Sequence, residues 1–563
     1  MNAQLSQGVV LASWAVLRDE RTMATTPQSD TARIARETVA AKPSREIVLE
    51  AAANELIVAV VGHVGSGTSE IAEALHDLLE HDELPGGPYE AEVLKARNEI
   101  EEWARGAGES LPTSERNDLE TTKTLQDLGD KMRTASNDAS AVARALVSRV
   151  RTTRANKIGH ALVDGVPVPP DGRRRAYILD AIRNPAEVDL LRHVYQDAFV
   201  LIGVVCDEKV RLQRIMEKYK NAGRADGEDL MKRDAKAASK FGQRVTDAFH
   251  LSDFFIDNTP NRTVDNGAAN PDWNVNEYLS RLVKIVSHSE IVRPSTEETA
   301  MHHAYGAALR SACLSRQVGA ALVDKTGNVV ATGTNEVPRA GGGVYGENFD
   351  TDHNGHSHDH RCAYRRLNGA DPFCSSTKEQ NSLIERFIEE IPELKAADGL
   401  RKQKLALELR SSGVGDLLEF SRAVHAEMDA LLSAAREGMS TVGCRLFVTT
   451  YPCHYCARHI VTAGIDEVQF IEPYPKSRAI DLHADSIQVS VQNWQPPSRE
   501  GDRVLFRPFV GVAPRMYRRA FMKDRDLKHG VHGHILQGDP DWGTPWHLRA
   551  VSYSDLEAKL ADS

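Results

Sequence analysis

The sequence lacks two features that would point to a membrane or to a nucleic acid. It contains no run of about 18 apolar residues, the length that a membrane-crossing helix needs, so we expect no membrane partner. Its 69 lysines and arginines face 80 aspartates and glutamates, which gives a formal net charge of −11. Proteins that bind polynucleotides usually carry a basic excess, so this balance counts against an enzyme that edits DNA or RNA.

Cysteine is also scarce, and 7 cysteines in 563 residues are too few for a disulfide framework. Two of them form a C-x-x-C pair, a spacing that binds metals in proteins of reducing compartments. We therefore expect a cytoplasmic protein. The chain is too long for one hydrophobic core, so two or three domains are predicted.

The most informative stretch contains HAE, which begins at His425, and PCHYC, which ends at Cys456. His425, Cys453 and Cys456 offer one imidazole and two thiolates to a zinc ion, and they leave a fourth coordination position open for water. An open position is typical of a catalytic site, whereas structural zinc sites use four protein ligands. H-x-E followed by P-C-x-x-C resembles the signature of zinc-dependent nucleobase deaminases, in which the glutamate, here Glu427, is no ligand but a general acid and base.

The local spacing predicts how these side chains converge. Cys453 and Cys456 are three residues apart, so both thiols face one way on the first turn of a helix that starts after Pro452. His425 and Glu427 are two apart and would diverge in mid-helix, so the metal must lie beyond the first turn of their helix. The alternatives are a structural zinc knuckle, or two core cysteines with an unrelated histidine.

An apolar, β-branched run at residues 56–62 predicts a strand that is buried on both faces of a parallel sheet. A glycine loop and a helical pattern follow, which is the context of a phosphate-binding P-loop. Thr68 replaces the usual lysine, which counts against phosphoryl transfer, and a glycine-rich turn without nucleotide is the alternative. We expect Mg²⁺ to accompany a nucleotide here. The predicted contacts are Gly62, Gly65, Ser66, Gly67, Thr68 and Ser69.

Strands that alternate with helices predict an α/β chain whose first half is a doubly wound parallel sheet. The glycine loop, ILDAIRN from residue 178 and KRD from residue 232 resemble P-loop nucleoside and nucleotide kinases. The expected organisation is a mobile segment at 1–50, a kinase-like domain at 54–288 with a helical insert at about 90–163, and a zinc domain at 293–563 with an insert at about 345–419 and a C-terminal extension at about 496–563.

Five segments between residues 295 and 483 carry a second resemblance: CLSRQVGAALVD, TGTNEVPRAGG, HAE, TTYPCHYC and TAGIDEVQFIEPYPKS. They look like the deoxycytidylate deaminase branch of the cytidine deaminase superfamily. This resemblance implies a three-layer αβα domain, Zn²⁺ and free deoxycytidine nucleotides, dCMP or dCTP, as substrates. The pairing with a kinase-like front half resembles bacterial two-domain deaminases of anti-phage defence, which are implied to deplete these nucleotides during infection. We expect a homo-oligomer.

The same resemblance implies roles for several residues. Asn335 holds the sugar, and the backbone of Ala426 contacts the base. Candidates for base stacking or phosphate contact are Arg316, Tyr474 and Lys476. Glu427 is expected to take a proton from the zinc-activated water, to deliver it to N3 of cytosine and to assist the departure of ammonia.

Other interpretations stay open. A polynucleotide cytosine or adenosine deaminase would need a basic groove with aromatic platforms, which the sequence does not display. A housekeeping dCMP deaminase that supplies dTTP would share the same site. The front half is expected to bind a nucleotide or an RNA regulator that holds the deaminase off. The histidine-rich stretch at residues 353–362 is expected to be a loop that covers the site, with a second metal site as the alternative.

Overall fold

A computed structural model of the chain describes residues 53–536 with short gaps, and residues 554 and 557 in addition. The gaps fall at residues 82–83, 85–86, 113–117, 220–221, 236, 238–240, 264–267, 269, 289, 347–349, 352–356, 365–370, 413, 415–416, 418–419, 475–476 and 524. The predicted mobile segment at 1–50 lies outside the described residues. So do His353 and His356 of the predicted covering loop.

The first half of the chain is built on a six-stranded sheet in the order β14-β5-β4-β1-β3-β2. The bounds of its first five strands are β1 Glu55–Val61, β2 Glu90–Lys95, β3 Arg175–Ile182, β4 Phe199–Val205 and β5 Phe254–Asp257. Strand β1 runs parallel to both β3 and β4, and all 7 of its residues are buried. A central parallel strand is covered on both faces, which explains why it has a continuous apolar sequence.

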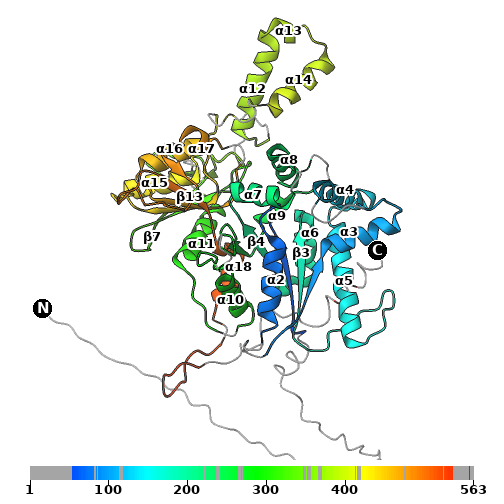
Figure 1. Cartoon of the computed structure of the whole chain (residues 1–563). Coiled ribbons are helices and arrows are strands. Elements are labelled where there is room, and N and C mark those ends of the chain that lie inside the picture. Colours follow the sequence, from blue (N-terminus) through cyan, green and yellow to red (C-terminus); the bar gives the residue numbers. More distant parts are fainter. Residues whose placement is uncertain are drawn as a thin grey trace, which may run out of the picture.

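Helices cover both faces of this sheet (Figure 1). They are α2 Thr68–Leu79, α3 Ala96–Gly106, α4 Leu119–Ala135, α5 Ala141–Ile158, α6 Pro185–Tyr195, α7 Glu208–Lys218, α8 Arg224–Ala235, α9 Val245–Phe249 and α10 Val275–Val286. The apolar sides of α2 and α10 share one core cluster, and those of α5, α6 and α9 share another on the opposite face. Among the described residues, no helix has the length and apolarity that crossing a membrane requires.

The expected helical insert at 90–163 is wrong at its start. Residues Glu90–Lys95 form the edge strand β2, which pairs in parallel with β3. The composition of EAEVLK favours a helix, but pairing with the free edge of β3 satisfies the backbone groups and buries Ala91 and Leu94. The described remainder of the segment holds α3, α4 and α5, as predicted.

The second half contains a six-stranded sheet in the order β12-β13-β11-β10-β6-β7. Its strands are β6 Gly319–Val323, β7 Val329–Thr334, β10 Arg445–Thr450, β11 Glu467–Glu472, β12 Ile487–Gln488 and β13 Val504–Pro508. Strands β6 and β7 form an antiparallel hairpin, and β10 runs parallel to β11. Helix α11, Thr296–Ala308, covers one face, and α15, Ala426–Arg436, and α16, His454–Thr462, cover the other, which makes three layers.

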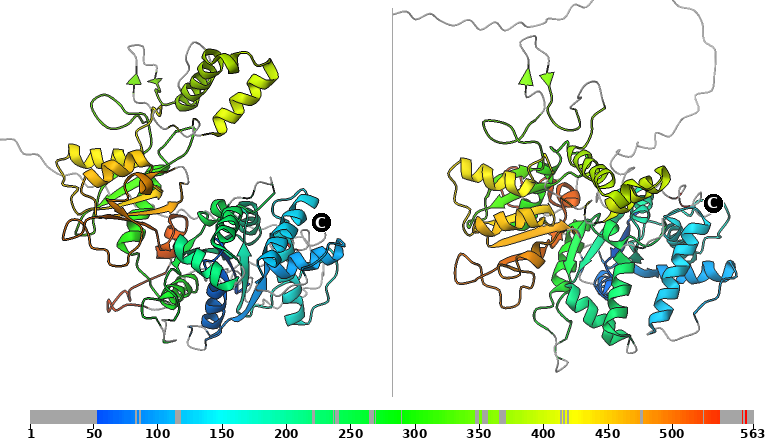
Figure 2. Two further views of the ribbon diagram at one scale, coloured as in Figure 1. Left: turned by 45° about the horizontal axis from the view of Figure 1, so that its top comes forward. Right: turned by 90° about the horizontal axis from the view of Figure 1, so that it is seen from above.

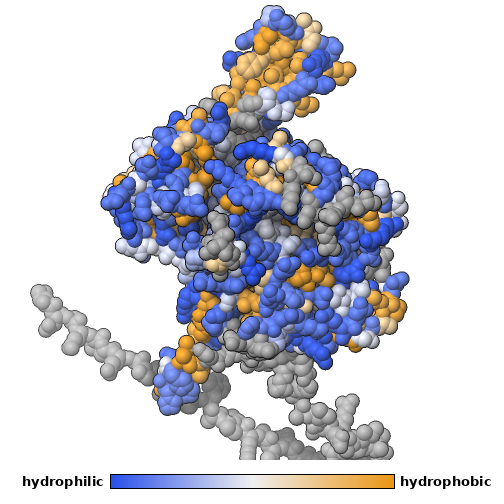
Figure 3. All heavy atoms as spheres, in the orientation of Figure 1, coloured by the Kyte–Doolittle hydropathy of each residue, from blue (hydrophilic) through white to orange (hydrophobic). Residues whose placement is uncertain are grey.

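An arm of three helices projects from this half (Figures 1 and 2). Helices α12, Ser375–Glu390, α13, Pro392–Lys395, and α14, Gly399–Ser411, pack mainly on one another. Helix α14 buries none of its described residues, and Leu400 and Leu407 are 82% and 69% exposed. Figure 3 shows the resulting apolar surface at the top of the molecule. The small elements nearby are β8 Asp350–Thr351, β9 Ser357–His358 and α17 Ala479–Leu482.

Residues 504–512 form two strands that belong to two different sheets. Strand β13 ends at Pro508, which has no N–H to continue the ladder, and the chain bends through Gly511, whose φ is 111°. Strand β14, Gly511–Val512, then pairs antiparallel with β5 and completes the first sheet. Helix α18, Pro514–Phe521, follows and packs on α10 and α11. The predicted C-terminal extension thus joins both halves.

Glu298 of α11 binds both α10 and β14 at the junction between the two halves. Its carboxylate closes a capping box with Ser295 and accepts the Val512 N–H at 2.8 Å. It also binds Arg281 of α10 through two hydrogen bonds of 2.6 and 2.7 Å. One buried carboxylate therefore links the first helix of the second half to both the front half and the returning strand.

Gly333 of β7 is predicted to be intolerant of any side chain. A Cβ there would lie 2.1 Å from the Ala426 carbonyl oxygen and 2.4 Å from the Ala430 nitrogen, because β7 passes directly under α15. We expect Gly333→Ala to destabilise the protein by about 1–3 kcal/mol through overpacking. A lowered thermal midpoint in calorimetry checks this.

The matched control is Gly306→Ala, which adds a methyl group within α11 where nothing lies within 4 Å. Its thermal midpoint should be unchanged or higher, since alanine favours helices by about 0.5–1 kcal/mol over glycine. Equal midpoints for the two variants would contradict the close approach of β7 and α15.

Candidate active site

Three predicted metal ligands converge at the ends of two helices. His425 is the N-cap of α15, Cys453 is the N-cap of α16, and Cys456 lies in the first turn of α16. The Nδ1 atom of His425 lies 3.3 Å from the Cys453 sulfur and 3.4 Å from the Cys456 sulfur. No other set of three His, Cys, Asp or Glu side chains in the described parts of the chain comes this close to forming a metal site.

The spacing of these atoms fits zinc. Zinc binds imidazole nitrogen at about 2.0–2.1 Å and thiolate sulfur at about 2.3 Å, so tetrahedral geometry separates the two ligand atoms by about 3.5 Å. The observed nitrogen–sulfur distances of 3.3 and 3.4 Å agree with that value. One imidazole with two thiolates also suits zinc by ligand type.

Packing against the second sheet fixes both helix starts. Strand β10 leads into Cys453 after only two intervening residues, and β10 is held between β6 and β11. The N-terminus of α15 is anchored by Asp429, whose carboxylate accepts the Thr334 N–H of β7 at 3.0 Å. Free N–H groups at a helix start stabilise thiolates, and Cys453 accepts the Cys456 N–H at 3.4 Å.

Glu427 stands beside these ligands with a perturbed acidity. The residue is 4% exposed, and burial raises its pKa to about 7, helped by the negative charge of Cys453. Hydrogen bonding to Cys456 lowers the pKa of Cys453 to about 4, and hydrogen bonding to Cys453 raises that of His425 to about 9. A carboxyl group that titrates near neutrality is suited to both accepting and donating a proton.

The predicted sugar-binding residue Asn335 has a structural task in this protein. Its Oδ1 accepts the Val318 N–H, and its Nδ2 donates to the Arg316 carbonyl oxygen, both at 2.7 Å. The side chain therefore fixes the backbone conformation of the loop before β6. Its contact with a sugar stays a prediction. Ala426 is fully buried as the first residue of α15, so only its backbone is available to a ligand.

Of the three candidates for stacking or phosphate contact, two lie together. The Arg316 guanidinium carbon lies 5.6 Å from the centre of the Tyr474 ring. Lys476 lies outside the described residues. Arg316 and Tyr474 are therefore neighbours in the fold, and their contact with a ligand stays a prediction.

Sequence reasoning missed Glu472, the last residue of β11. Its Oε2 accepts a hydrogen bond from Thr450 Oγ1 at 3.1 Å and lies 3.5 Å from Arg316. A signal was present, because FIEPYPKS places an acidic residue at the end of a strand beside the predicted site. It also missed Glu336, whose buried carboxylate accepts the N–H groups of Ala312 and Val337.

The glycine loop of the front half has the strand–loop–helix geometry that its sequence predicts. Gly65 and Gly67 have φ values of 84° and 86°, and α2 begins at Thr68. The Ser69 hydroxyl donates to Asp180 at 2.7 Å. The Ser66 hydroxyl is buried and makes no hydrogen bond within the described structure. Gly62 carries the strand into the loop, and a Cβ there would meet Ser66 Oγ at 2.4 Å.

Two charged side chains lie against this loop. Arg183 donates to the Gly62 carbonyl oxygen at 3.1 Å and to Asp234 at 2.8 Å. The other oxygen of Asp234 accepts the Val64 N–H at 2.8 Å, so a carboxylate already binds one loop amide. Burial raises the pKa of Asp234, and Arg183 opposes that rise.

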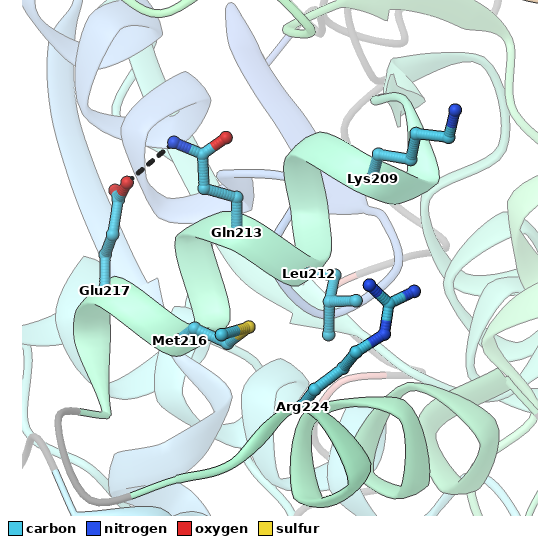
Figure 4. A pocket seen from close by; sticks show the side chains of 6 residues that line it. All are labelled: Lys209, Leu212, Gln213, Met216, Glu217 and Arg224. Atoms are coloured by element: carbon cyan, nitrogen blue, oxygen red, sulfur yellow. Dashed lines mark hydrogen bonds between the residues drawn. The ribbon is translucent and has the colours of Figure 1, made fainter.

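A surface hollow of about 470 Å³ lies between α7 and α8 (Figure 4). It is lined by Lys209, Leu212, Gln213, Met216, Glu217 and Arg224. None of the predicted site residues lines it, and we assign it no part in the chemistry.

Comparison with known proteins agrees with the site. The family model described as "Cytidine and deoxycytidylate deaminase zinc-binding region" matches residues 294–472. The deoxycytidylate deaminases of Enterobacteria phages T2 and T4 are each 30% identical over 182 residues, which is 32% of this chain and 81% and 79% of theirs. The chain belongs to the deoxycytidylate deaminase family. It is therefore a hydrolase, and the zinc-binding match coincides with His425, Cys453 and Cys456.

A solved structure was also found, the dCMP deaminase of the cyanophage S-TIM5 in apo form. It is 18% identical, and the match covers 38% of this chain and 99% of that one, with a TM-score of 0.19. A superposition this weak carries no argument. The family assignment of the deaminase half depends on the sequence matches.

Glu427→Gln is predicted to separate metal binding from catalysis. The amide keeps the shape of the side chain but cannot accept a proton, so the deamination rate should fall by about 10²- to 10⁴-fold. Zinc measured by mass spectrometry should stay at about one ion per chain. Turnover close to that of the wild type would contradict the proton-transfer role.

The contrasting variant is Cys453→Ala, which removes a ligand. It should lose zinc as well as activity, and its thermal midpoint should fall because metal binding contributes to folding stability. Unchanged zinc content in this variant would show that the ligand set is wrong.

Proposed function

We propose that the protein is a zinc-dependent deaminase of free deoxycytidine nucleotides, which converts dCMP or dCTP to dUMP or dUTP. The observation that carries this proposal is the buried Glu427 beside three zinc ligands, in a segment that matches deoxycytidylate deaminases. The net charge of −11 favours a free nucleotide over a polynucleotide.

The residues present suit hydrolytic deamination. Zinc, when bound by His425, Cys453 and Cys456, supplies a polarised water whose pKa falls towards about 7. Glu427 would take a proton from the attacking water and deliver it to N3 of cytosine as the water oxygen bonds to C4. It would then pass the proton of the new C4 hydroxyl to the amine, which leaves as ammonia as the C4–N4 bond breaks. One carboxyl group performs both transfers because its pKa of about 7 lets it release the proton it has gained. The backbone of Ala426 contacts the base.

A substrate panel tests the proposal. The purified protein is incubated with dCMP, dCTP, CTP and single-stranded DNA, and ammonia release is measured. We expect turnover of dCMP or dCTP, with CTP and DNA at least about tenfold slower, because the proposed site recognises a free deoxynucleotide. Deamination of DNA alone would contradict the proposal and favour a polynucleotide deaminase.

We propose further that this activity depletes deoxycytidine nucleotides in defence against phage, in the cytoplasm, as the resemblance to two-domain defence deaminases implies. The same chemistry would serve a housekeeping enzyme that supplies dTTP. Measurement of cellular dCTP and dTTP during phage infection distinguishes the two roles. A defence enzyme lowers dCTP only after infection, whereas a housekeeping enzyme maintains dTTP in uninfected cells.

The front half, residues 54–288, is proposed to be a kinase-like unit that binds a nucleotide or an RNA regulator and controls the deaminase unit at 293–563. The geometry of Gly65, Gly67 and Ser69 supports a phosphate cradle, with Mg²⁺ beside the Ser69 hydroxyl. Thr68 lacks the charge that would stabilise a transferring phosphoryl group, so no efficient transfer is expected. We also propose a homo-oligomer, in which the exposed leucines of α14 contact another copy.

Gly67→Ala tests the control by the front half. A Cβ there would lie 2.4 Å from Asn258 Nδ2 at a φ of 86°, so the loop must distort while the zinc site is untouched. We expect ATP or GTP binding measured by calorimetry to be lost and the deamination rate to change several-fold. Gly108→Ala, at a φ of 71° in open space, should change neither. Release of γ-phosphate at rates typical of kinases would contradict the non-catalytic role.

A further inference from the structure

The short helix α9 of the front half contacts both the glycine loop and the deaminase sheet. Thr246 Oγ1 lies 3.0 Å from Nε2 of His63 in the glycine loop, and the Phe249 ring is centred 5.6 Å from the His63 ring. His250 follows the helix, and its Nε2 lies 3.8 Å from Oε1 of Glu472. The Nδ1 of His250 is 3.1 Å from the Thr246 carbonyl oxygen, which fixes the direction of the ring.

Glu472 stands at the edge of the deaminase site. It is the last residue of β11 and pairs in register with Thr450, three residues before the zinc ligand Cys453. Its carbonyl oxygen accepts the Tyr451 N–H at 2.7 Å. This backbone contact does not involve the Glu472 side chain, so a change of the side chain leaves the start of the ligand helix in place.

The two carboxylate oxygens of Glu472 have different partners. Oε2 accepts the Thr450 hydroxyl at 3.1 Å and lies 3.5 Å from an Arg316 guanidinium nitrogen. Oε1 faces His250 and forms an ion pair with it when the imidazole is protonated. These side chains are 25–45% exposed, so each ion pair adds little stability. The two ion pairs restrict rotation of the Glu472 carboxylate. This carboxylate in turn orients the Arg316 guanidinium.

Arg316 is the cation that Glu472 orients. Its guanidinium lies over the Tyr474 ring at 5.6 Å, and its carbonyl oxygen accepts the Asn335 amide. A guanidinium binds phosphate through two parallel hydrogen bonds from its planar fork, so its orientation affects the affinity.

We propose that Glu472 is a positioning residue that holds Arg316 for the phosphate of the nucleotide, and that His250 of the front half completes this arrangement. The proposal depends on the proposed function, since it names the contact that distinguishes a nucleotide from a nucleoside at the same site. It gives the front half a side chain that acts on substrate affinity. It also connects the glycine loop to the phosphate contact through one five-residue helix and the residue that follows it.

The first test is a double-mutant cycle on dCMP with Arg316→Ala, Glu472→Gln and the double variant. Each single change should raise KM several-fold, with kcat within about twofold, because binding is affected and the proton transfer is not. The double variant should have the KM of Arg316→Ala, since Glu472 acts through the arginine. With deoxycytidine, which has no phosphate, the KM of all three should match the wild type.

The second cycle combines His250→Ala with Glu472→Gln. Here too the effects on KM for dCMP should not add, and zinc content and thermal midpoint should stay at wild-type values. Glu437→Gln, an exposed carboxylate at the end of α15, is the matched control and should leave KM unchanged. Three results would overturn the inference while the deaminase assignment stands. They are additive effects on KM in either cycle, equal effects on the KM of dCMP and of deoxycytidine, and an unchanged KM in His250→Ala. A wild-type protein that turns over neither dCMP nor dCTP would overturn both.

Discussion

The structure of the deaminase half depends on two helices that begin at one point. Helices α15 and α16 bring His425, Cys453 and Cys456 together at their N-termini, where free N–H groups and aligned dipoles favour negatively charged ligands. A separate feature fixes the start of each helix. Gly333 lets α15 pack directly on β7, and α16 begins shortly after the C-terminal end of β10. The buried Glu427 follows, and burial among these groups brings its pKa to about 7. The proposed metal binding and the proposed proton transfer therefore have the same structural cause.

The two halves of the chain are joined in ways that a simple tandem arrangement does not require. Strand β14 returns from the second half to complete the first sheet, and Glu298 binds both Arg281 and the backbone of that strand. One core cluster extends from β1 of the front half to Met301 and Phe447 of the deaminase half. Contacts of this extent make it physically reasonable for a change at the glycine loop to reach the zinc site.

Local sequence patterns predicted the parts of the structure that depend on local geometry. The spacing of HAE and PCHYC predicted that His425, Cys453 and Cys456 come together at helix starts, and the structure brings them together. The run from residue 56 predicted β1 because a central parallel strand is apolar throughout. Strand β2 was not predicted, because its pairing with β3 overrides a sequence composition that favours a helix. The break between β13 and β14 depends on which sheet accepts each strand, and the meeting of His250 with Glu472 joins segments far apart in the chain. Such features are decided by tertiary pairing.

The central claim is that three protein ligands leave a fourth zinc position open beside Glu427. X-ray absorption at the zinc edge of the purified full-length protein measures the ligands directly. The structure predicts two sulfurs at about 2.3 Å, one imidazole nitrogen at about 2.0–2.1 Å and one further light atom from water. A spectrum with four sulfurs, or with two sulfurs and two imidazoles, would show a closed structural site and contradict the account.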